Sequence, residues 1–147
     1  MGVVRHQVKV DAPRERVFEY VDGYQNVPEY LFGVKRFSPT TDRTKGLGSV
    51  FEVAIDVGPK TLKSVVECTQ YIENELIELK AVKGFRANTT WRFGDTGDGG
   101  TDLQVEFDYT LPGGIAGKLL GGLVEPFAAQ AIKHTEATIA TKVAQND

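Results

Sequence analysis

The chain offers few histidine or cysteine side chains for metal binding or nucleophilic attack. Its 147 residues include two histidines, His6 and His134, and one cysteine, Cys68. Structural zinc sites take four Cys or His ligands at short spacings, and one cysteine cannot form an internal disulfide. The sequence therefore predicts neither a metal site nor a disulfide framework, and we assign no cofactor.

The remaining candidate groups lie in stretches where apolar and polar residues alternate. Tyr109 and Trp91 can each donate a hydrogen bond from an apolar surface, and Thr89 can orient a carbonyl group. His134 follows Phe127 at helical spacing and is expected to contact a ligand from the inner side of a helix. The apolar faces carry no Asp or Glu, the groups that a cyclase or dehydratase would use as acid or base. We assign no catalytic residue, and an enzymatic role stays open.

The amino-acid composition indicates which kinds of molecule the protein can bind. The chain is 41% hydrophobic and 25% charged, and no apolar run approaches the roughly 18 residues that a membrane-spanning helix needs. Its formal net charge of -3 is spread without a basic block, whereas clustered Lys and Arg supply most of the affinity for nucleic acid. We expect a cytoplasmic protein that binds a small molecule and no nucleic acid, as a monomer or a homodimer.

Hydrophobic periodicity predicts an α+β fold. Residues 3–10 alternate as in a half-buried strand, and residues 11–21 and 24–33 predict two short helices. Between residues 34 and 110, turn signals such as "VGPK" and "GDTGDGG" separate six more strands, whose short connections make them antiparallel neighbours. Apolar residues at spacings of three and four predict one long helix over residues 115–144.

Seven strands form a sheet that one helix cannot cover. At about 4.8 Å per strand the sheet is close to ~30 Å wide, whereas a helix with its side chains is about 10–12 Å across. The sheet must curl around the long helix, and its uncovered apolar face either encloses a cavity or is filled by side chains. The predicted cavity lining consists of Phe51, Val53, Ile55, Phe85, Thr89, Trp91, Phe93, Phe107 and Tyr109 from the strands, and of Leu120, Leu123, Val124, Phe127 and His134 from the long helix.

Four segments resemble the helix-grip fold of the START and birch-pollen-allergen (SRPBCC) superfamily. They are "VKVDAPRERVFEYV", "VPEYLFGVKRF", "GLGSVFEV" and "FDYTLPGGIAGKLLGGLVEPF", in that order. The resemblance is strongest to a bacterial branch that includes polyketide cyclases/dehydrases and coenzyme Q-binding proteins. It implies one domain over residues 1–147, with a curved seven-stranded antiparallel sheet wrapped around a long C-terminal helix and two short helices after the first strand. It also implies an internal apolar cavity but no particular reaction.

Three functions remain open at this point. The first is binding or carriage of a hydrophobic small molecule, such as a lipid, a quinone or a polyketide-like compound, in the internal cavity. The second is a polyketide-type cyclase or dehydratase reaction in the same cavity. The third is protein interaction through the glycine-rich start of the long helix, residues 113–123, a segment that also suits peripheral contact with a membrane or close packing on the sheet.

Overall fold

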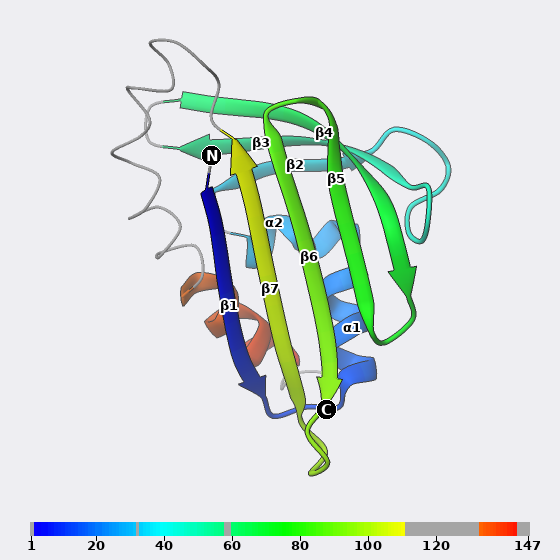
Figure 1. Cartoon of the computed structure of the whole chain (residues 1–147), viewed down its shortest axis with the longest axis vertical. Coiled ribbons are helices and arrows are strands. Elements are labelled where there is room, and N and C mark those ends of the chain that lie inside the picture. Colours follow the sequence, from blue (N-terminus) through cyan, green and yellow to red (C-terminus); the bar gives the residue numbers. More distant parts are fainter. Residues whose placement is uncertain (1, 32, 58–59, 111–132, 144–147) are drawn as a thin grey trace.

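The secondary structure follows the predicted order. The computed structural model describes residues 2–31, 33–57, 60–110 and 133–143 (Figure 1). Its elements are β1 (Gly2–Val10), α1 (Arg14–Asp22), the 3-10 turn η1 (Tyr24–Asn26), α2 (Val27–Tyr30), β2 (Val34–Pro39), β3 (Val50–Val57), β4 (Lys60–Ile72), β5 (Leu76–Gly84), β6 (Arg86–Asp95) and β7 (Thr101–Thr110). A further helical segment covers residues 133–143.

The strands form one strongly curled antiparallel sheet. Its order is β1-β7-β6-β5-β4-β3-β2. Figure 1 shows β1, β7, β6 and β5 side by side along the long axis, whereas β2 and β3 cross that direction, and the long strand β4 joins the two parts. Helices α1 and α2 and the 133–143 segment lie on the same side of the sheet. This arrangement confirms the predicted helix-grip fold.

Side-chain alternation assigns one face of the sheet to the interior. On β6, Ala87, Trp91 and Phe93 are buried, whereas Arg86 and Arg92 are exposed. Successive side chains of a strand point to opposite faces, so this pattern places the apolar set against the helices. The predicted orientation of β6 is confirmed.

The core between sheet and helices joins distant parts of the chain. Val17 of α1 and Ile139 and Val143 of the 133–143 segment are all completely buried. The Phe18 ring packs edge-on against Phe93, with ring centroids 5.1 Å apart. Burying each such side chain contributes about 1.5–3 kcal/mol to the stability of the folded protein, so these contacts are a main source of the packing between the sheet and the helices.

The short helix α2 is held by side chains from other elements. A four-residue helix leaves most of its backbone carbonyls without partners inside the helix; here Val27 O accepts from Leu31 N–H, and Glu29 and Tyr30 need partners from elsewhere. The Thr135 hydroxyl donates a hydrogen bond of 2.6 Å to the Tyr30 carbonyl oxygen, and His134 Nε2 lies 2.7 Å from the Glu29 carbonyl oxygen. The Tyr30 hydroxyl in turn donates a hydrogen bond of 2.7 Å to the Val21 carbonyl oxygen of α1. These bonds fix α2 against both neighbouring helices.

Part of the predicted long helix is not described. Residues 133–143 are helical, in agreement with the prediction for 115–144, whereas the glycine-rich segment 113–123 lies outside the described residues. Among the described residues, no helix is long and apolar enough to cross a membrane.

Candidate functional site

Two small cavities lie between the inner face of the sheet and α2. One has a volume of about 50 Å³ and the other of about 30 Å³. Tyr30 and Trp91 line both cavities, and their rings meet edge-on with centroids 5.5 Å apart. The larger cavity is walled almost wholly by aliphatic and aromatic side chains, so it suits an apolar group.

Six of the predicted binding residues line these cavities. They come from β3, β6 and β7, whose inner faces the curl of the sheet brings together. The larger cavity is lined by Val53, Ile55, Thr89, Trp91 and Phe107, and the smaller one by Phe51 and Trp91.

Other predicted residues lie elsewhere. Phe93 belongs to the core against α1, and the Tyr109 ring stacks on Phe107 with centroids 5.7 Å apart. Phe85 occupies the bend between β5 and β6 and is half-buried. Neither cavity is lined by any of Phe93, Tyr109 or Phe85. The four helix residues Leu120, Leu123, Val124 and Phe127 lie outside the described part of the chain.

His134 lies at the surface beside α2. Its side chain is exposed and its ring contacts the Glu29 carbonyl oxygen. The buried side of the 133–143 segment is formed by Thr135, Ile139 and Val143, which are spaced four residues apart. One helical residue turns the chain by about 100°, so His134 is directed away from that side. His134 lines neither of the two cavities.

A carboxyl and tyrosine pair borders the smaller cavity, and the sequence reasoning did not find it. Asp22, the last residue of α1, accepts a hydrogen bond of 2.7 Å from the Tyr71 hydroxyl of β4. Burial raises the pKa of Asp22 above its ordinary value, and the Tyr71 hydrogen bond and the nearby Lys45 ammonium oppose this effect. Burial also raises the pKa of the Cys68 thiol, to about 11, and Asp22 adds to that effect. A half-buried acid therefore borders the smaller cavity, whose other polar lining residues include Tyr24, Thr44, Lys45 and Ser49.

A second pair of ionisable groups joins β1 to the 133–143 segment. The half-buried His6 ring lies on the inner face of β1, and its Nε2 pairs with the Glu136 carboxylate. This pair ties the edge of the sheet to the helix. The described residues contain no group of three or more His, Cys, Asp or Glu side chains placed to hold a metal ion.

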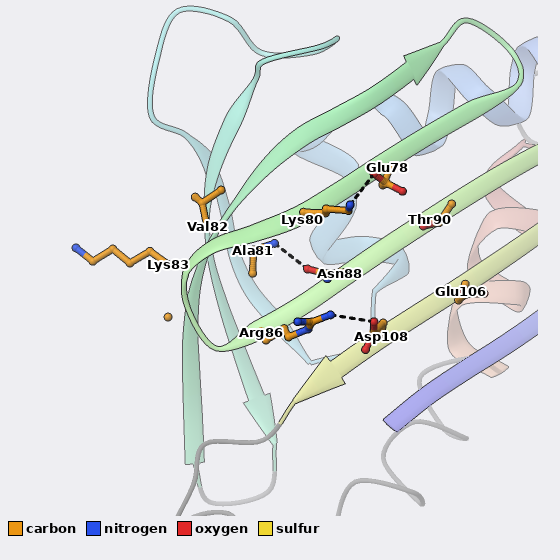
Figure 2. Close-up of a pocket in the computed structure, with 11 residues that line it drawn as sticks. Glu78, Lys80, Ala81, Val82, Lys83, Arg86, Asn88, Thr90, Glu106 and Asp108 are labelled. Carbon is orange, nitrogen blue, oxygen red and sulfur yellow. Dashed lines mark hydrogen bonds and ion pairs between the residues drawn. The ribbon is translucent and has the colours of Figure 1, made fainter. Parts of the chain in front are cut away.

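A larger hollow lies on the opposite, outer face of the sheet. It has a volume of about 740 Å³ and is lined mainly by charged and polar side chains of β5, β6 and β7 (Figure 2). Lys80 pairs with Glu78 at 3.6 Å, and Arg86 pairs with Asp108 at 3.3 Å. Because these charges neutralise one another and face solvent, we place the candidate site on the inner face despite its smaller volume.

The outer hollow forms because β5 and β6 diverge. Their pairing ends at Leu79 and Thr89, and beyond that point the Ala81 backbone N–H donates to the Asn88 side-chain oxygen at 2.9 Å (Figure 2). Gly84 ends β5 with φ +81°. A Cβ there would lie 2.5 Å from a backbone oxygen of β4, so only glycine fits this bend.

The curled sheet, the helices on its inner face and the apolar cavities between them define a helix-grip protein. The chain belongs to the family described as "Polyketide cyclase / dehydrase and lipid transport", whose model matches residues 1–144. That family membership supports binding of a hydrophobic ligand or cyclase activity, without specifying the substrate.

Solved structures share the fold across nearly the whole chain. The protein TTHA0849 from Thermus thermophilus superposes with a TM-score of 0.82 at 21% identity, covering 99% of each chain. A START superfamily protein from Mycobacterium smegmatis has a TM-score of 0.77 at 18% identity, also covering 99% of each chain. The Zhui aromatase/cyclase from a Streptomyces species has a TM-score of 0.76 at 15% identity, covering 98% of this chain and 94% of that one. No curated protein matches the chain significantly.

Proposed function

We propose that the protein binds or carries a hydrophobic small molecule between the inner face of the sheet and α2. The observation that carries the proposal is the apolar wall that β3, β6 and β7 present around the cavity of about 50 Å³. The proposed contact residues are Phe51, Val53, Ile55, Thr89, Trp91 and Phe107. The other residues assigned to the site from the sequence stay predictions.

Apolar burial would supply the affinity. Each square ångström of apolar surface removed from water contributes about 25 cal/mol, and the cavity walls offer few polar atoms to oppose it. Pockets for drug-sized ligands have volumes of about 300–1,000 Å³. A lipid or quinone therefore needs more space than the two cavities between the described residues provide, and wall side chains must move to admit it.

Native mass spectrometry of the purified protein tests this function. We expect an adduct that denaturing extraction identifies as a lipid, a quinone or a polyketide-sized compound. A protein that carries no adduct, and whose mass does not shift with added fatty acids, quinones or aromatic polyketides, would contradict the proposal.

A substitution that fills the cavity tests its location. Ala87 is 6% exposed and lines the larger cavity, so Ala87→Leu places three extra carbons in the space that the ligand needs. We expect at least a roughly tenfold loss of affinity, equivalent to about 1.4 kcal/mol. Thr90→Leu is the matched control, because Thr90 lies three residues along the same strand and lines the outer hollow. Equal effects of the two substitutions, with both variants folded by circular dichroism, would place the ligand elsewhere.

A polyketide cyclase reaction is the second candidate function. The observation that favours it is the Asp22 carboxyl, which is half-buried beside the cavity and has a raised pKa. Such a group can exchange a proton with an enolisable carbonyl. The test is incubation with a linear poly-β-keto thioester: aldol cyclisation followed by dehydration lowers the mass by one water, and Asp22→Asn should slow that change. Absence of the product with the unmodified protein would leave only the binding function.

A further inference from the structure

The smaller cavity has a polar corner at the end of α1. Asp22 lines this cavity, and its Oδ2 atom accepts a hydrogen bond of 2.7 Å from the Tyr71 hydroxyl. Within the described part of the chain, no hydrogen bond reaches the other carboxylate oxygen of Asp22. A carboxylate can accept several hydrogen bonds, so this corner can still receive a donor.

The size of the cavity suits a single small polar group. Its volume is about 30 Å³, and a water molecule needs about 10–15 Å³ measured in this way. The other walls include the rings of Phe51, Tyr30 and Trp91. A hydroxyl or an amine fits this space, while the rest of an apolar ligand would lie in the adjoining cavity of about 50 Å³, with which it shares Tyr30 and Trp91.

Two of the hydroxyl groups that line this cavity already use their protons. The Ser49 hydroxyl donates to the Gly46 carbonyl oxygen at 2.7 Å, and the Tyr30 hydroxyl donates to the Val21 carbonyl oxygen at 2.7 Å. Each hydroxyl therefore offers the cavity only its lone pairs. Tyr24, Thr44 and Lys45 also line the cavity, but the Asp22 carboxylate itself only accepts hydrogen bonds, so the ligand group that completes it is a donor.

The charges around this corner oppose a ligand carboxylate. Glu73 acts on Asp22 from the turn after β4 and adds to the negative potential, as does the C-terminal end of α1. Lys45 lines the same cavity and opposes them, but its side chain is exposed and its charge is screened by water. A second carboxylate beside Asp22 would meet repulsion that a neutral or cationic donor does not.

We propose that the cavity beside Asp22 holds the hydroxyl or amine end of an otherwise apolar ligand, and that Asp22 selects hydrogen-bond donors over carboxylates. This inference rests on the proposed binding function, because it assigns the polar end of the same ligand.

Ligands with the same twelve-carbon chain and different end groups test whether Asp22 selects hydrogen-bond donors. Dissociation constants are measured by calorimetry for dodecanol, dodecylamine, dodecanoic acid and the methyl ether of dodecanol, with the unmodified protein and with Asp22→Leu and Asp22→Asn. We expect the unmodified protein to bind the alcohol and the amine about tenfold more tightly than the ether, and the acid least tightly. Asp22→Leu should remove the preference for the alcohol over the ether, and Asp22→Asn should reduce the discrimination against the acid about tenfold. Glu19→Leu, an exposed position on the same helix, should change neither ratio.

The outcomes separate this inference from the function on which it rests. Equal binding of all four probes, or ratios that stay unchanged in both Asp22 variants, would overturn the assignment of the polar end and leave hydrophobic binding intact. Failure of every probe to bind the unmodified protein would overturn both. If Asp22→Leu does not fold, the ratios of the probes' dissociation constants in Asp22→Asn alone test the role of Asp22.

Discussion

The Tyr30 hydroxyl provides the sharpest test of how the helices are held over the candidate site. Tyr30 is 2% exposed and donates to the Val21 carbonyl oxygen, which lies in the last turn of α1. Tyr30→Phe removes the donor and keeps the ring, so the edge-on contact with Trp91 remains. The loss therefore comes from one carbonyl group that is left buried without a partner.

Such a group costs about 1–3 kcal/mol. With a urea dependence of about 2 kcal/mol per molar, a loss of about 2 kcal/mol lowers the unfolding midpoint by about 1 M without changing the slope. Urea unfolding followed by tryptophan fluorescence measures this, since Trp91 is the only tryptophan in the sequence and lies against Tyr30.

Tyr24→Phe is the matched control. Among the described residues, the Tyr24 hydroxyl has one hydrogen bond, a solvent-exposed one of 3.3 Å that it accepts from Gln25, so its removal should change the free energy of unfolding by less than about 0.5 kcal/mol. A Tyr30→Phe variant as stable as the control would refute the reasoning, because the Val21 carbonyl would then have another source of hydrogen bonding.

Two further predictions concern pKa values. The pKa of Asp22 is raised in the folded protein, so its contribution to stability is complete below the ordinary Asp pKa and is lost as the pH rises through the folded value. Acidification from pH 7 to pH 4 should therefore stabilise the unmodified protein relative to Asp22→Asn. Urea unfolding midpoints whose difference between the two proteins stays constant over this range would contradict the prediction. The Cys68 thiol is buried and its pKa is raised to about 11. Its alkylation by iodoacetamide in the native protein, followed by mass spectrometry, should therefore be slow and should keep accelerating above pH 9. A rate that levels off near pH 9 would show that Cys68 titrates as an ordinary thiol.

The faces of the strands could be predicted from the sequence because strand periodicity is strict. In β6 the alternation of apolar and polar residues agrees with the observed burial, and in β4 the same alternation turns Ser64, Val66 and Cys68 to the interior. The physical reason is that the opposite parity would have buried Lys63 and Glu67 without partners.

The polar residues of the site could not be predicted in this way. The alternation in β4 fails after Cys68, where an irregularity in the pairing with β5 brings Tyr71, rather than Gln70, toward α1. The faces of the strands give no sign of Asp22, because it lies at the end of a helix. His134 was assigned to the inner side of a helix from its spacing alone, although the contacts of Thr135 and Ile139 determine which side is buried.

The bonds that hold α2 also constrain when the site can form during synthesis. The carbonyl groups of Glu29 and Tyr30 obtain their partners from residues 105 positions later in the chain. Strand β1 likewise pairs with β7, nearly a hundred residues downstream. Such distant contacts make folding slow, because the closure of a long loop precedes any gain from the contact. On the ribosome, α2 therefore lacks the two contacts that hold it over Trp91 until residues 133–143 have emerged, an interval in which a chaperone or the ligand itself can meet the inner face of the sheet.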